Sequence, residues 1–318
     1  RLGDFYEMFF DDAIVVSKEL ELTLTGKSCG AEERAPMCGV PYHAVEGYLN
    51  KLVANGHKVA ICEQVEDPKL AKGLVKREVI RIVTPGTNTD MQALDESKNN
   101  YIMCIVYLAD KYGISLADIS TGDYFVTEVD TERKLIDEIN KFAPSEIICN
   151  ESFYMSGVDL SDMKNRLGIA VYSLEAWYFS DETAENTLKE HFKVQSLEGL
   201  GLSDYACGTI AAGALLRYLY ETQKNDLGNL SAIHPYSTGK YMIIDSSTRR
   251  NLELVETLRE KQKRGSLLWV LDKTKTAMGA RTLRAYVEQP LIDADAINER
   301  LDAVTELNMQ AMLREEIR

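Results

Sequence analysis

The sequence lacks three features that would assign it at once to a class of protein. No two of its six cysteines lie close together, so neither a disulfide framework nor a Cys-x-x-Cys metal site is indicated. The longest apolar runs, such as 210–216, are far shorter than the roughly 20 residues that a membrane-spanning helix needs. The chain begins with Arg and shows no signal peptide. We therefore expect a fragment of a cytoplasmic protein, with reduced thiols, no membrane anchor and its native start missing.

Length and composition indicate a globular protein of several domains. With 318 residues and 45% hydrophobic residues, the chain is long enough for two or three domains that each bury a core. Its net charge of −14 argues against a nucleic-acid partner unless the charge is uneven, because phosphates repel acid.

The charge is indeed uneven along the chain. Residues 1–87 carry 11 Lys and Arg against 13 Asp and Glu, and residues 236–318 carry 14 against 13. Residues 88–235 carry 11 against 24, so nearly all the excess acid lies in the middle third. The middle third is therefore the part least suited to lie on DNA.

Hydrophobic patterns predict a mixture of helices and strands. Helical spacing of apolar residues recurs at 13–24, 43–55, 131–141, 204–223, 247–263, 276–287 and 293–313. Runs typical of strands occur at 58–63, 78–83, 101–108, 114–119, 124–128 and 146–149. The three runs from 101 to 128 are separated by turns with glycine and predict an antiparallel meander. A turn at 85–90 and a polar stretch to 100 mark the first domain boundary.

The segment Gly3-Asp4-Phe5-Tyr6-Glu7 places an aromatic ring and a carboxylate two positions apart, beside a turn. If the segment is extended, Phe5 and Glu7 point to the same side, because strand side chains alternate. A flat ring beside an anionic acceptor suits an unstacked base: the ring can wedge between base steps while the carboxylate accepts a hydrogen. The alternative is a half-buried strand with one charged residue in solvent.

A resemblance to a known family is carried by six segments of the chain: Gly3-Asp4-Phe5-Tyr6-Glu7, Pro36-Met37-Cys38-Gly39-Val40-Pro41-Tyr42-His43-Ala44, Val59-Ala60-Ile61-Cys62-Glu63-Gln64, Arg81-Ile82-Val83-Thr84-Pro85-Gly86-Thr87, Asp118-Ile119-Ser120-Thr121-Gly122 and Asp245-Ser246-Ser247-Thr248-Arg249-Arg250-Asn251-Leu252-Glu253. With these segments, the chain resembles the MutS family of DNA mismatch repair proteins over residues 1–318. The resemblance implies an α/β multidomain chain. The expected parts are a small mixed α/β mismatch-recognition domain (1–87, its N-terminus truncated), a linker (88–97), an RNase H-like α/β connector (98–235) and the mainly helical beginning of the core or lever domain (236–318).

The resemblance also implies a function and partners. The family's Phe-x-Glu motif, which meets the mispaired base in duplex DNA, falls on Phe5 and Glu7. The family's ATPase, with its ATP and Mg²⁺, lies beyond residue 318, so we expect no catalysis and no cofactor within these residues. Further expectations are a MutL-type protein bound by the connector, a homodimer for the full-length protein, and a nucleoid-associated cytoplasmic location. The alternative is a connector that serves chiefly as a protein-interaction module, with negligible DNA affinity in this fragment.

Backbone contacts to DNA are expected from basic residues of the first domain. Residues 69–81 form a short basic stripe, and the candidates by charge and neighbourhood are Lys27, Lys72, Arg77 and Arg81. A solvated, lysine-rich loop is the alternative for the stripe.

Other chemical motifs are incomplete. Thr25-Gly26-Lys27-Ser28 matches the end of a P-loop, but Glu21 stands where that motif requires glycine. Cys38 and His43 have no second pair of metal ligands, and we expect a packing cysteine and a turn histidine.

A metal-dependent nuclease is a further alternative, because RNase H chemistry gathers several carboxylates around two metal ions. The candidates are Asp118, Asp123 and Glu128. We interpret Asp118 as a turn cap, since aspartate is common in turns.

Overall fold

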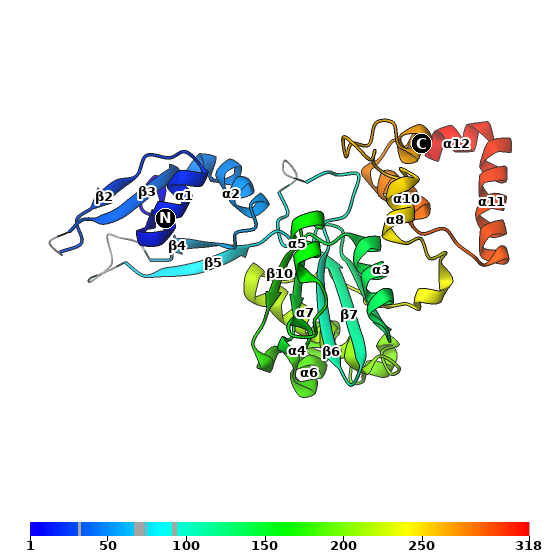
Figure 1. The fold of residues 1–318 in the computed structure, drawn as a ribbon, viewed down its shortest axis with the longest axis horizontal. Helices are drawn as coiled ribbons and strands as arrows, with labels where there is room; N and C mark the ends of the chain where they lie inside the picture. Colours follow the sequence, from blue (N-terminus) through cyan, green and yellow to red (C-terminus); the bar gives the residue numbers. More distant parts are fainter. Residues whose placement is uncertain (31–32, 67–72, 74, 91–93, 318) are drawn as a thin grey trace.

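A computed structural model describes every residue except 31–32, 67–72, 74, 91–93 and 318. The chain runs through three successive units in Figure 1: a first unit of two small sheets, a middle unit built on one large sheet, and a last unit of helices. The chain contains both helices and sheets, so its fold is mixed α/β, as the sequence predicts.

The first unit consists of a three-stranded antiparallel sheet in the order β1-β3-β2 and a separate hairpin, β4-β5. Helix α1 packs on β3. Helix α2 contributes to two hydrophobic cores: Leu52 packs in the core beneath α1, and Leu49 and Val53 pack in the core of the hairpin. The elements are β1 (Phe5–Phe9), α1 (Phe10–Glu19), β2 (Thr25–Lys27), β3 (Ala35–Pro41), α2 (Val45–Ala54), β4 (Val59–Gln64) and β5 (Arg77–Val83), with a 3-10 turn, η1 (Tyr42–Ala44), before α2.

The predictions for this unit hold for α2, β4 and β5, but helix 13–24 is misplaced: α1 begins at Phe10 and ends at Glu19. Strand β3 was not predicted. Prolines at both of its ends, Pro36 and Pro41, hide the strand pattern, because proline cannot donate to a ladder.

The middle unit is a six-stranded mixed sheet in the order β10-β9-β6-β7-β8-β11. The predicted meander is confirmed: β6, β7 and β8 are antiparallel neighbours, while β9 pairs with β6 in parallel. Its elements are β6 (Ile102–Leu108), β7 (Lys111–Asp118), β8 (Asp123–Val129), α3 (Glu132–Phe142), β9 (Glu146–Cys149), α4 (Glu151–Tyr154), α5 (Leu160–Leu167), β10 (Ala170–Ser173), η2 (Ala176–Phe179), α6 (Asp181–Phe192), η3 (Leu197–Leu200), α7 (Ala206–Gln223) and β11 (His234–Pro235).

Both faces of this sheet are buried. Helix α7 covers one face with α6 packed behind it, and α3, α4 and α5 cover the other. Alternation along β6 serves both cores, since Cys104 belongs to the α7 side and Met103 and Ile105 to the other. Helix α7 lies against β7 so closely that a Cβ on Gly113 would come within 2.2 Å of the Cys207 backbone. The predicted apolar helix at 204–223 is therefore core.

The last unit corrects two predictions. Helix 247–263 ends early: α8 spans Ser246–Asn251, and Glu253 and Lys261 have φ of +47°, which a helix cannot contain. The chain turns back there so that Leu254 and Val255 pack on Leu268. The predicted helix 293–313 is two helices that separate at Gln310. The elements are η4 (Thr238–Lys240), α8, α9 (Leu267–Leu271), α10 (Ala277–Glu288), α11 (Ala294–Met309) and α12 (Ala311–Ile317).

No helix within the described ranges has the length and apolar character to cross a membrane. The domain boundaries at 87, 97 and 235 and the RNase H-like label for the middle unit remain predictions.

Candidate nucleic-acid interface

Strand β1 presents the Phe-x-Glu pair on one face, as the alternation predicts. Tyr6 and Met8 point to the other side and join the cores beneath α2 and α1. Phe5 and Glu7 therefore share the opposite face, each paired with a residue of β3. Before them, Gly3 takes a φ of +60° in the turn that leads into the strand, a conformation that glycine adopts without strain.

The Phe5 ring is exposed and free to meet a ligand. Phe5 is one of the large apolar residues on the surface, and 46% of it is accessible to solvent. Phe10, at 60%, is a second exposed ring just beyond the strand. An exposed aromatic ring on a strand offers a flat stacking surface for any base.

Glu7 forms an ion pair with Lys27 of strand β2, which lies on the other side of the central strand β3. The Lys27 Nζ lies 2.7 Å from Glu7 Oε2 and 5.4 Å from the centre of the Phe9 ring. The central strand leaves room for this pair because its residue opposite Glu7 is Gly39, where a Cβ would lie 3.5 Å from Glu7 Cγ. The carboxylate thus carries a lysine as counter-ion on the face that Phe5 occupies.

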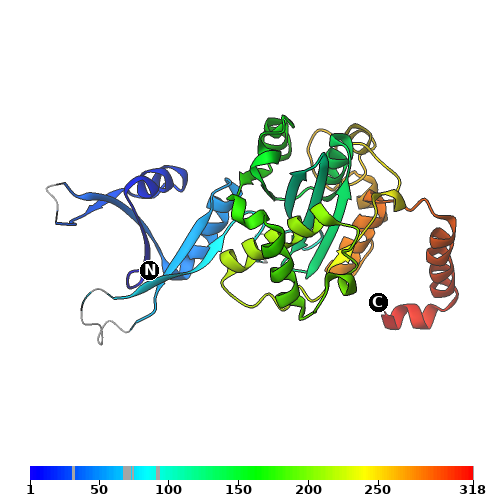
Figure 2. The same ribbon diagram turned by 90° about the horizontal axis from the view of Figure 1, so that it is seen from below.

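The other basic candidates lie elsewhere in the first unit. Arg77 and Arg81 are on β5 of the hairpin, and Arg81 pairs with Glu46 of α2 at 3.3 Å. Lys72 is outside the described residues. Figure 2 shows the β2-β3 sheet and the β4-β5 hairpin as two arms that extend in the same direction, away from the middle unit. Of the candidates, the structure brings together Phe5, Glu7 and Lys27, and places Arg77 and Arg81 on the other arm.

Tyr6 connects the two arms, which sequence reasoning missed. Its hydroxyl donates a hydrogen bond to Glu63 on β4, and its ring joins the core of the hairpin. Burial, together with the Glu63 carboxylate, raises the pKa of Tyr6 to about 12. The signal was present, because a residue between Phe5 and Glu7 on a strand must face the opposite side.

The carboxylates proposed for nuclease chemistry are occupied by the chain's own donors. Asp118 accepts from the backbone N–H and hydroxyl of Ser120 at 2.8 and 2.6 Å, which is the expected turn cap. The Asn99 side-chain amide donates to both Asp118 and Asp123 at 2.9 Å. Glu128 instead accepts from the N–H of Gly208. Within the residues that the structure describes, no group of three His, Cys, Asp or Glu is arranged to hold a metal ion.

The remaining motifs have structural roles. Gly26 and Lys27 belong to strand β2, not to a loop that opens a helix, so the partial P-loop match has no P-loop structure. Cys38 is buried in the core of α1, where burial raises the pKa of its thiol. His43 lies in the 3-10 turn before α2 and packs edge-on against Tyr42.

Comparison with known proteins gives consistent matches along the chain. Family models described as MutS domain I, MutS domain II and MutS domain III match residues 1–92, 100–231 and 247–318. Proteins named DNA mismatch repair protein MutS are similar over the whole chain: those of Lachnoclostridium phytofermentans, Acetivibrio thermocellus and Clostridium tetani are 68%, 52% and 49% identical. The chain covers 34%, 37% and 35% of these three proteins, or about a third of their length.

Proposed function

Because this chain belongs to the MutS family, we propose that its first unit recognises mispaired or unpaired bases in duplex DNA for mismatch repair. The observation that carries this proposal is the exposed Phe5 ring beside the Glu7 carboxylate on one face of β1. The two side chains reach the base from the minor groove, where apolar wedges kink DNA.

Phe5 supplies wedging that is independent of sequence. Stacking on an aromatic ring contributes roughly 1–3 kcal/mol per base and tolerates every base. Selectivity comes from the duplex, because a mispaired step costs less to unstack and kink than a paired one. The ring thus binds where the DNA deforms most easily.

Glu7 accepts a hydrogen from the displaced base and penalises intact pairs. A carboxylate near phosphates is repelled, so an unpaired base must offset that cost with a hydrogen bond. Lys27, whose Nζ lies 2.7 Å from the Glu7 carboxylate, reduces this repulsion and can itself contact the DNA backbone. Arg77, Arg81 and Lys72 are the further candidates for phosphate contacts.

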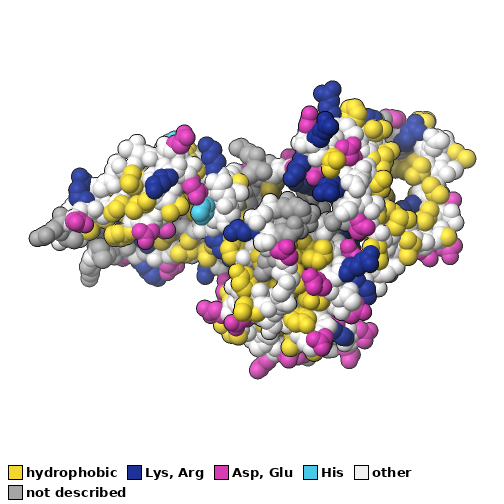
Figure 3. Space-filling view, viewed as in Figure 1, with side chains coloured by type: hydrophobic (Ala, Val, Ile, Leu, Met, Phe, Trp, Pro, Cys, Tyr) yellow, Lys and Arg dark blue, Asp and Glu magenta, His cyan; other side chains and the backbone are white. Residues whose placement is uncertain are grey.

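The middle unit acts as the connector and faces protein partners. Figure 3 shows acidic side chains spread over its lower surface, in agreement with the excess of acid between residues 88 and 235. Such a surface would steer a basic partner, for which a MutL-type protein is the candidate. ATP and Mg²⁺ binding, the ATPase and the homodimer belong to the rest of the full-length protein, and no catalysis is assigned to these residues.

The same acidic surface favours a second function, in which the connector is chiefly a protein-interaction module and the DNA affinity of residues 1–318 is negligible. Binding of MutL that survives removal of residues 1–87 would support this alternative. The nuclease alternative is not favoured, because Asp118 and Asp123 already bind Asn99.

The test is binding of a duplex with a G·T pair or a single unpaired T, at low salt, against its fully paired twin. We expect the chain to prefer the mismatched duplex and Phe5→Ala to lose that preference. Phe10→Ala is the matched control, since it removes a ring that is also exposed but lies beyond the strand. Equal binding of both duplexes by the unaltered chain would contradict the proposal and favour the protein-interaction module.

A further inference from the structure

We propose that Glu146 is a positioning residue: it fixes the base of the β4-β5 hairpin against the middle unit and so sets the orientation of the first unit. Glu146 opens β9, an otherwise apolar strand, and is 0% exposed. Strand neighbours lie on both sides of it, Ile102 of β6 and Ala170 of β10. Its side chain shares the face of Ile148, which packs toward α7.

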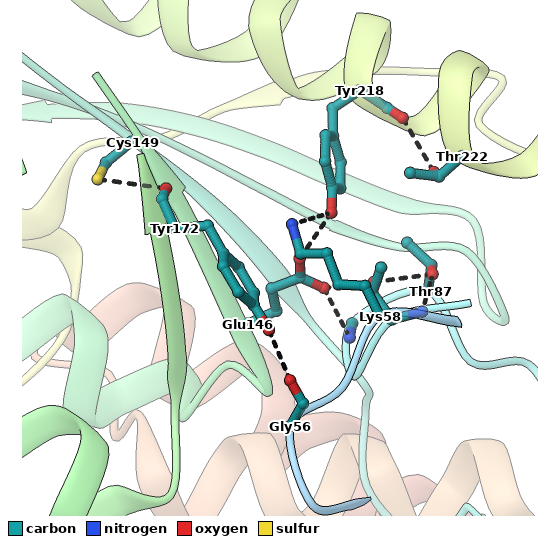
Figure 4. Close-up of polar contacts among 10 residues, drawn as sticks. Gly56, Lys58, Thr87, Glu146, Cys149, Tyr172, Tyr218 and Thr222 are labelled. Carbon is teal, nitrogen blue, oxygen red and sulfur yellow. Dashed lines mark hydrogen bonds and ion pairs between the residues drawn. The ribbon is translucent and has the colours of Figure 1, made fainter. Parts of the chain in front are cut away.

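The carboxylate binds groups from both units. From the first unit, Gly86 donates its backbone N–H to Glu146 Oε2 at 3.1 Å, and the Thr84 hydroxyl donates to the same oxygen. From helix α7 of the middle unit, the Tyr218 hydroxyl donates to Oε1 at 2.8 Å. Figure 4 shows the Tyr218 hydroxyl pointing from α7 toward the Glu146 carboxylate. Oε2 therefore accepts from the first unit, and Oε1 accepts from helix α7.

Lys58 adds a second connection across the same boundary. Its Nζ lies 3.6 Å from Glu146 Oε1 and donates to the Tyr218 hydroxyl at 2.9 Å. The ammonium also lies 3.6 Å from the centre of the Tyr172 ring, and the Tyr172 hydroxyl donates to the Gly56 carbonyl at 2.8 Å. Charge, aromatic face and hydrogen bonds thus all join residues 56–58 to the middle unit (Figure 4).

These contacts hold the open end of the hairpin. Lys58 immediately precedes β4 and Thr84 immediately follows β5, so both strands are fixed where they leave the hairpin. The segment after β5 is also tightly packed, since a Cβ on Gly86 would lie 2.7 Å from Ile102 Cβ.

From the hairpin, Tyr6 and Glu63 continue the contact to β1. A continuous set of packed and hydrogen-bonded groups therefore leads from Glu146 to the strand of Phe5 and Glu7. Relative motion is the usual expectation for domains joined by modest interfaces, and a buried, multiply bonded carboxylate opposes it. The effect of this orientation on mismatch recognition rests on the proposed function, whereas the fixed orientation itself does not.

The experiment measures distances between spin labels in the free 318-residue chain by pulsed electron resonance. Labels are attached through Lys51→Cys on α2 and Glu190→Cys on α6, both exposed positions, in a background that carries Cys29→Ser and Cys62→Ser. With Glu146 intact we expect a single narrow distance distribution.

Glu146→Gln and Thr84→Val are expected to broaden the distribution about twofold, as freed domains move relative to one another. Glu138→Gln is the matched control: this carboxylate is also buried, but it binds Lys141 and Tyr236, away from the first unit. We expect that control to leave the distribution narrow.

Circular dichroism identifies any variant that fails to fold. If Glu146→Gln does, Tyr172→Phe replaces it, because it removes only the hydrogen bond to the Gly56 carbonyl. An unchanged distribution in folded Glu146→Gln and Thr84→Val, or in Tyr172→Phe where it stands in, would overturn the proposal. Since no DNA is present, loss of mismatch preference and loss of orientation are separate results.

Discussion

Two Glu–Lys pairs in this chain differ in what surrounds them. Glu7 and Lys27 lie 2.7 Å apart on the surface, with side chains 17% and 45% exposed. Glu146 and Lys58 lie 3.6 Å apart at the junction of the first and middle units, with side chains 0% and 30% exposed. The shorter distance belongs to the more exposed pair.

The comparison shows that the environment, not the distance, decides what such a pair does. An exposed pair contributes about 0–1 kcal/mol, because water screens it and long side chains lose freedom. A buried carboxylate has paid a large desolvation cost, so each of its partners is needed to offset that cost. The surface carboxylate can therefore exchange Lys27 for a ligand, whereas the interior one holds two units in place.

The largest expected loss of stability is caused by Glu146→Ala. This change leaves Lys58 partly buried without its anion and deprives Thr84 and Tyr218 of their acceptor. We expect the free energy of unfolding to fall by about 3–5 kcal/mol, the usual range when one partner of a buried pair is removed. Urea denaturation measures it.

Lys58→Met provides the control for that prediction, since it keeps the aliphatic stem and leaves the carboxylate with its hydrogen bonds to Gly86, Thr84 and Tyr218. It should cost clearly less than Glu146→Ala. Equal losses in the two variants would mean that the charge pair, rather than the hydrogen bonds, stabilises the junction.

The next effect is steric. Gly86→Ala would place a Cβ 2.7 Å from Ile102 Cβ and 3.1 Å from Glu146 Cβ, and overpacking of this kind costs about 1–3 kcal/mol. Gly47→Ala is the opposite control, because Gly47 lies in α2 with nothing within 4 Å of its added Cβ. That change should stabilise the chain by about 0.5–1 kcal/mol, as alanine does in a helix. Thermal unfolding of the two variants should shift in opposite directions.

Alkaline pH tests the junction without changing Glu146. Burial, with the Glu146 carboxylate nearby, raises the pKa of Tyr172 to about 12, above the value of about 10 in an unfolded chain. Between these values the unfolded chain has released a proton that the folded one retains, so stability falls as pH rises. Below about pH 10 the contribution is complete and independent of pH.

Tyr172→Phe should therefore lose less stability than the unaltered chain between about pH 10 and pH 12, measured by urea unfolding at each pH. Tyr6, whose pKa is also raised to about 12, stays in both proteins and cancels in the difference. Identical slopes would show that Tyr172 titrates as it does in the unfolded chain.

Local patterns were enough to predict most of the elements. Alternation and turns located β4 to β9, and helical spacing located α2, α3, α7 and α10. The end of helix α8, by contrast, depends on a contact distant in sequence. Helix α8 ends because Leu254 and Val255 turn back to pack on Leu268, which no local pattern encodes.

Glu7 and Glu146 also differ in how far their surroundings could be predicted from the local sequence. The shared face of Phe5 and Glu7 follows from the period of a strand and was predicted. The pairing of Glu7 with Lys27 was not, since it depends on a strand order that places β3 between them. Glu146 had one local signal, a charge at the start of an apolar strand, but its partners lie about 60 to 90 residues away in the chain, beyond the reach of local patterns.

The smallest effect on stability is expected at the surface pair. Glu7→Gln removes the charge but keeps the shape and the acceptor oxygen, so the free energy of unfolding should change by no more than about 0.5 kcal/mol. DNA binding should change more than stability does. An amide is not repelled by phosphates, so affinity for the fully paired duplex should rise more than affinity for the mismatched one. Fluorescence anisotropy on both duplexes measures the ratio, with Lys27→Met as the control that leaves the carboxylate unneutralised. A large loss of stability in Glu7→Gln would show that the surface pair is structural after all, and the contrast with Glu146 would then be lost.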